Sequence, residues 1–104
     1  MIQFNDIECK SGVARAYPPT GFGGSWEWRG EVEFKFSQQI QELLIASEYI
    51  GPLYGMPDRK IDQIIGDVYI TSLIFGENEQ GIKGVKFEGT GAPKVKGKPL
   101  EVPK

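Results

Sequence analysis

Side chains that could carry out catalysis are few in this chain. The sequence contains no histidine and one cysteine, Cys9, which excludes Ser–His and Cys–His nucleophiles, histidine bases and a cysteine-built zinc site. Two close carboxylate pairs remain, Asp58 with Asp62 and Glu77 with Glu79, and paired carboxylates can act as general acid and base. Both pairs fall at turns or junctions, where exposed acidic residues are common. We therefore expect no catalytic residue, no metal and no cofactor, and a protein that is not an enzyme.

Two further motifs could bind a ligand. The run Gly21-Phe22-Gly23-Gly24 lacks the full dinucleotide pattern and precedes strand-like sequence, so it indicates a turn rather than a phosphate loop. Trp26 and Trp28 lie on one face of the following segment and could stack bases or a small ligand. A core position is favoured for them, and an aromatic binding face remains the alternative.

The segment from Trp26 to Phe36 must position these tryptophans. Its even positions are mostly apolar, its odd positions are charged, and this period of two predicts a strand with one buried face. The even positions are Trp26, Trp28, Gly30, Val32, Phe34 and Phe36, and the odd positions are Glu27, Arg29, Glu31, Glu33 and Lys35.

The period changes after this strand. Ile40, Leu43 and Leu44 share one helical face, Ser37 is a good N-cap, and Gly51-Pro52 ends the pattern after Ile50. The sequence predicts one amphipathic helix at about 37–50, packed on the aromatic face of the sheet.

Further strands flank these elements. Short strands at 2–4 and 7–10 surround the turn pair Asn5-Asp6, and a long strand at 61–75 is apolar on both faces, with a bend or bulge at Gly66-Asp67. The residues at 76–81 form a hairpin turn, and the last strand, 83–88, directs Val85 and Phe87 inward. The expected fold is mostly β (α+β): an antiparallel β-sandwich or partly closed barrel with one helix on it.

Length and charge limit the organisation. The 104 residues predict a single β-rich domain at 1–92, followed by a basic Pro/Gly-rich tail at 93–104. The net charge of −2 argues against a general nucleic-acid binder. No apolar run reaches the length of a membrane span, and we expect no signal peptide and no membrane association.

The C-terminal hairpin carries a resemblance. The segment Asp67 to Phe75, its turn, and Gly81 to Ala92 with the ending Phe87-Glu88-Gly89-Thr90-Gly91 resemble the final hairpin of tailed-phage tail tube and related tail proteins. The resemblance implies hexameric rings that stack into a tube, with Gly89, Thr90 and Gly91 near the subunit boundary. It also implies other phage tail proteins as partners, and a location in the virion or the bacterial cytoplasm.

Unpaired strand edges and apolar loops favour self-association, because such surfaces must be covered. Candidate subunit contacts are Pro18, Pro19, Phe22, Tyr54 and Met56. We expect a homo-oligomeric, non-enzymatic structural subunit of a phage or prophage tail-like assembly, with tail tube, terminator and accessory roles left open. The alternative is a monomeric module that binds a ligand or single-stranded nucleic acid through Trp26 and Trp28.

Overall fold

The computed structural model describes residues 2–17, 27–43, 47–55, 60–76 and 81–100. These residues are mostly in strands, as predicted. The elements are β1 (Gln3–Phe4), β2 (Ile7–Tyr17), β3 (Glu27–Gln38), the 3₁₀ turn η1 (Ile40–Glu42), β4 (Ser47–Leu53), β5 (Ile61–Phe75), β6 (Ile82–Gly89), β7 (Lys94–Val95) and β8 (Lys98–Pro99).

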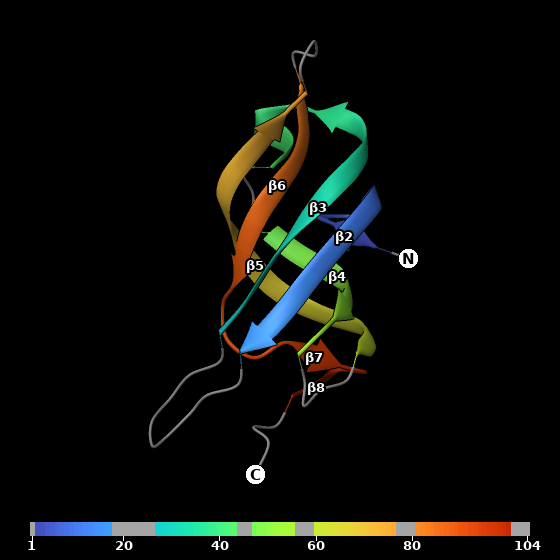
Figure 1. The fold of residues 1–104 in the computed structure, drawn as a ribbon, viewed down its shortest axis with the longest axis vertical. Coiled ribbons are helices and arrows are strands. Elements are labelled where there is room, and N and C mark those ends of the chain that lie inside the picture. The colour runs from blue at the N-terminus through green and yellow to red at the C-terminus, as the bar shows by residue number, and fades with distance from the viewer. Residues whose placement is uncertain (1, 18–26, 44–46, 56–59, 77–80, 101–104) are drawn as a thin grey trace.

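Within the described residues, six antiparallel strands close into one barrel (Figure 1). The order β4-β1-β2-β3-β6-β5 returns to its start because β5 also pairs with β4. The antiparallel, mostly β prediction is confirmed. The architecture is a closed barrel rather than a sandwich or a partly closed barrel, and closure pairs strands that would otherwise be sheet edges.

The predicted helix at about 37–50 is wrong. β3 continues to Gln38, η1 supplies a single turn, and β4 begins at Ser47, while residues 44–46 lie outside the described part. From Ser47 to Leu53 burial alternates with period two, so the three apolar residues at helical spacing misled the prediction. Pro52 does not end a helix but lies where the β4–β5 register shifts, a position that tolerates a missing N–H group.

β3 follows the predicted alternation over most of its length. Trp28, Val32 and Phe34 are buried, whereas the charged odd positions from Glu27 to Lys35 are exposed. Phe36 is the exception, because it is 80% exposed. Its prediction as an inward residue is wrong, and Trp26 lies outside the described residues.

The first hairpin forms around Asn5-Asp6, as predicted. Both residues have positive φ, 51° and 64°, which matches the two-residue turn that suits right-twisted strands. The Asn5 side-chain oxygen also accepts a hydrogen bond from the Glu48 amide at 2.8 Å. This contact ties the turn to β4.

We expect Asp6→Gly to stabilise the protein by about 0.5 kcal/mol, because glycine adopts positive φ without the strain of a side chain. Asn5→Gly serves as the control, since it relieves the same strain but deletes the bond to Glu48 and should be destabilising. Urea denaturation of both variants measures the difference. Equal effects of the two changes would contradict the assignment.

β5 is the longest strand and joins both halves of the barrel. It pairs with β4 from Ile61 to Val68 and with β6 from Val68 to Phe75. The pairing register is continuous through Gly66-Asp67, so the predicted bulge does not occur there, whereas the alternative of a bend stays a prediction. The register shifts of β5 lie between Ile61 and Ile64, between Ile70 and Ser72, and next to Phe75. On β6, Val85 and Phe87 are buried as predicted.

Residues 93–100 differ from the predicted tail. Lys94 pairs with Ile65 of β5, β7 and β8 form a hairpin, and the Leu100 amide donates to the Pro93 carbonyl at 2.9 Å. Pro93 is fully buried. This part of the chain therefore belongs to the folded domain, and residues 101–104 lie outside the described part.

The barrel interior is filled by aromatic rings. Tyr49 and Phe87 lie at its centre with ring centroids 4.9 Å apart. Phe4 packs edge-on against Phe34 at 6.0 Å, and Trp28 packs edge-on against Phe87 at 6.2 Å. Such edge-to-face contacts stabilise the core beyond simple burial.

Candidate functional site

Trp28 is a core residue and not part of a binding face. It is 2% exposed, and its Nε1–H donates a hydrogen bond to the Gly91 carbonyl at 2.8 Å. A Cβ added at Gly89 would lie 2.0 Å from the indole, and one added at Gly66 would lie 2.4 Å away. The alternative aromatic binding face is therefore wrong for Trp28, because burial leaves no ring surface on which a ligand could stack.

The run Gly89-Thr90-Gly91 packs against Trp28 and is fixed by backbone hydrogen bonds. Besides the Gly91 carbonyl, the Thr90 amide and hydroxyl both donate to the Asp67 carbonyl, at 2.9 and 3.2 Å. The structure thus gives these residues a role within one chain, and their place at a subunit boundary stays a prediction.

The predicted contact residues lie mostly outside the described part of the chain. Pro18, Pro19, Phe22 and Met56 lie outside the described residues. Tyr54 is half-buried and is held by two backbone bonds to β2, at Ala14 and Ala16, both 2.9 Å. Its role in contacts between subunits stays a prediction.

The carboxylate pairs do not form a site in the described part of the chain. Asp62 is exposed and lies 3.8 Å from the Lys60 ammonium, whereas Asp58, Glu77 and Glu79 lie outside the described residues. No group of three or more Cys, Asp or Glu side chains that could hold a metal occurs among the residues the structure places. In the described part of the chain, no helix has the length and apolar character needed to cross a membrane.

Cys9 is buried, as the sequence predicts, and carries an altered pKa. Burial is the main cause that raises the pKa of its thiol from 9.0 to about 11. Burial also raises the pKa of Tyr49, whose hydroxyl donates to the Pro52 carbonyl at 2.9 Å. Both groups are therefore uncharged in the folded protein well above neutral pH.

We expect stability to fall above pH 9. Between pH 9 and 11 the Cys9 thiol ionises in the unfolded chain but stays protonated in the fold, so rising pH favours unfolding. Tyr49 adds to this loss from about pH 10, its ordinary pKa. Urea denaturation from pH 7 to 11 should show the decline. In Cys9→Ala the loss of stability that begins near pH 9 should be absent. A pH profile of stability identical to that of wild type would contradict the raised pKa of Cys9.

The neighbouring strands β2, β3, β6 and β5 form one side of the barrel, and we call their solvent-facing surface the wall. At one end of the wall, side chains of these strands contact one another. The Arg29 guanidinium lies 4.8 Å from the centre of the Tyr17 ring. The Tyr69 hydroxyl donates to the Glu88 carboxylate, and this hydrogen bond raises the pKa of Tyr69. A depression of about 340 Å³ lies among these four side chains. These four side chains thus contact one another in two pairs, and Glu27 also lines the depression.

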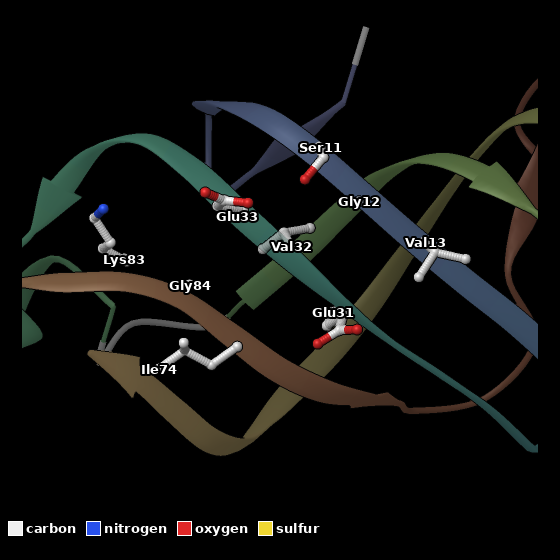
Figure 2. A pocket seen from close by; sticks show the side chains of 9 residues that line it. All are labelled: Ser11, Gly12, Val13, Glu31, Val32, Glu33, Ile74, Lys83 and Gly84. Atoms are coloured by element: carbon white, nitrogen blue, oxygen red, sulfur yellow. The ribbon is translucent and has the colours of Figure 1, made fainter. Parts of the chain in front are cut away.

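A larger groove of about 520 Å³ lies further along the same wall (Figure 2). Val13 of β2 and Ile74 of β5 supply apolar side chains to it, and Gly84 of β6 leaves an opening between the strands. A Cβ at Gly84 would lie 2.4 Å from the Val32 carbonyl oxygen, so close strand packing keeps this position bare. We call this the wall groove; its lining residues are Ser11, Gly12, Val13, Glu31, Val32, Glu33, Ile74, Lys83 and Gly84.

Three large apolar side chains are exposed at one end of the barrel. Phe36 is 80% exposed, Phe75 61% and Ile40 48%. Phe75 of β5 and Gln38 of β3 both pair with Ile82 of β6. The backbone at Phe75 therefore lies two strand spacings, or about 10 Å, from the end of β3, which is next to Phe36 and Ile40. Figure 1 shows the ends of β3 and β5 and the start of β6 at this end. We call Phe36, Ile40 and Phe75 the rim patch.

Sequence reasoning missed both surfaces. The wall groove combines residues from four strands that are distant in the sequence, and no motif marks it. Phe36 lies at an even position of β3, like the buried residues of that strand, so the alternation predicts burial. Its exposure can be seen only from where the packed part of the barrel ends. Comparisons of the chain with protein-family models, curated proteins and solved structures find no match. The fold defines the class of protein only as a small closed antiparallel β-barrel.

Proposed function

We propose that this protein is a non-enzymatic structural subunit that self-associates, within a phage or prophage tail-like assembly. The observation that carries the proposal is the rim patch. Two phenylalanines and an isoleucine exposed at one end of a closed barrel contribute nothing to its own core, and exposed apolar clusters mark protein interaction sites.

The closed barrel changes how copies would meet. The sequence favours contacts through strand edges, but β4 and β5 pair within one chain. Side chains at the rim, rather than unpaired backbone, are then the stronger candidates for the contact. Loops near Tyr54 remain a second candidate.

The tail-like assembly is supported by the resemblance of the hairpin from Asp67 to Ala92. β5 and β6 form an antiparallel hairpin over this segment, and a mostly β subunit agrees with what the resemblance implies. Tail tube, terminator and accessory roles remain equally compatible with these features.

Size-exclusion chromatography with light scattering tests the proposal. We expect wild-type protein to form species of several copies that grow with concentration, and rings or short tubes in electron micrographs. The double variant Phe36→Ser/Phe75→Ser should shift the mass toward the monomer, because it removes the apolar contact. Wild-type protein that stays monomeric at millimolar concentration would overturn the proposal.

A further inference from the structure

We infer that Phe36 of one copy inserts into the wall groove of the next, so that copies join head to tail. This inference rests on the proposed self-association and names its two surfaces. The partner is a second copy of this chain, and the contact joins an apolar side chain at the rim to an apolar recess on the wall.

The shapes of the two surfaces match. Phe36 is the most exposed of the large apolar side chains that the structure describes. The wall groove has room for a phenyl ring, since its volume is about 520 Å³ and Gly84 places no side chain in it. Val13 and Ile74 supply apolar surface on opposite sides of the groove, three strands or about 14 Å apart, so the ring would pack against one of them. Aromatic side chains that fill such pockets dominate the energy of many interfaces.

The charges beside the two surfaces are complementary. Lys35 precedes Phe36; its side chain is about half exposed, and its ammonium contacts Glu8 at 2.6 Å. Glu31, Glu33 and Lys83 line the wall groove, so two carboxylates against one ammonium leave it acidic on balance. Glu33 lies 3.6 Å from the Lys10 ammonium, and no ion pair of Glu31 occurs among the described residues. A copy seated by Phe36 would bring Lys35 toward these carboxylates and favour this orientation.

The position of the surfaces determines the type of assembly. The rim and the wall are different parts of the molecule, so the contact uses two unlike patches. Contacts between unlike patches are heterologous, and they generate rings when the rotation closes and filaments when it does not. A ring or tube follows when each copy gives Phe36 to one neighbour and receives that of another in its groove, whereas two copies that exchanged Phe36 reciprocally would form an isologous pair and stop at a dimer.

A mixing experiment with two variants tests the inference. Phe36→Ser removes the inserted side chain, and Val13→Lys blocks the groove while placing lysine opposite Glu31, which should preserve the fold. Each variant alone should self-associate at least about tenfold more weakly than wild type. An equimolar mixture should form a one-to-one complex, because Val13→Lys retains Phe36 and Phe36→Ser retains the groove. Ile65→Ser, which changes another exposed residue of the wall, should assemble as wild type does.

Light scattering of these samples distinguishes a failure of the proposed self-association from a failure of the Phe36 contact alone. A monomeric wild type overturns the proposed function and the inference with it. A second outcome is that wild type assembles, Phe36→Ser does not, and Val13→Lys assembles normally. In that case the wall groove does not bind Phe36, and the inference alone is wrong. A mixture that stays monomeric, or a wild type that stops at a dimer, also overturns it. Should Val13→Lys fail to fold by circular dichroism, Ile74→Ser takes its place with the same expected results.

Discussion

Trp28→Ala is expected to lower the free energy of unfolding by about 3–5 kcal/mol, as removal of a buried tryptophan usually does. The change leaves a cavity beside Phe87 and Tyr49 and leaves the Gly91 carbonyl without its donor. Since small domains are stable by only about 5–15 kcal/mol, the melting temperature should fall by at least about 12 °C. Urea denaturation followed by circular dichroism measures the loss.

Two further variants make this result specific. Trp28→Phe keeps a ring but not the bond to Gly91, and should cost about 1–3 kcal/mol. Phe36→Ala removes an aromatic side chain of the same strand that is 80% exposed, and should change stability by less than about 0.5 kcal/mol. Similar losses for Trp28→Ala and Phe36→Ala would contradict the placement of both residues.

Gly89→Ala is expected to cost about 1–3 kcal/mol, through overpacking of the core. Its Cβ would lie 2.0 Å from atoms of the Trp28 indole, which is fixed by its hydrogen bond and cannot move away freely. Thermal and urea denaturation measure this loss. The cost should shrink when the same change is made in Trp28→Phe, because the smaller ring leaves more space.

Gly97→Ala is the matched control for this steric effect. Gly97 has φ of +81° and no neighbouring atom within 4 Å of the added Cβ, so alanine there is strained only by the backbone, at about 1 kcal/mol. That cost should be the same in wild-type and Trp28→Phe protein. A Gly89→Ala cost that is equally insensitive to Trp28 would refute the proposed contact.

Much of the barrel could be predicted from local patterns. Alternation located β3 and β6 because each buries one face, and the pair Asn5-Asp6 located the first hairpin because those residues tolerate positive φ. Cys9 is in the core, as expected for a lone cysteine within a strand. In each case the deciding interaction is local, so the sequence carries it.

The failures involve interactions between distant residues. The segment at 47–53 forms a strand because β1 and β5 offer partners on both sides. The helical spacing of Ile40, Leu43 and Leu44, which precede this segment, does not predict its pairing. Phe36 is exposed because it lies beyond the packed part of the barrel, which depends on all six strands. The wall groove depends on the register of four strands at once and has no local signal.

The seam between β1 and β4 has a consequence for how the chain folds. It pairs Gln3 with Ile50 and Phe4 with Tyr49, so the two strands meet only after the intervening chain has been organised. The β5–β6 hairpin can form from neighbouring residues, but closing this seam requires a long loop to be ordered first, which slows folding to about milliseconds or longer. Newly synthesised chains would therefore spend that interval with β1 and the edge of β4 that faces it unpaired, and encounters between them at high concentration would compete with completion of each barrel.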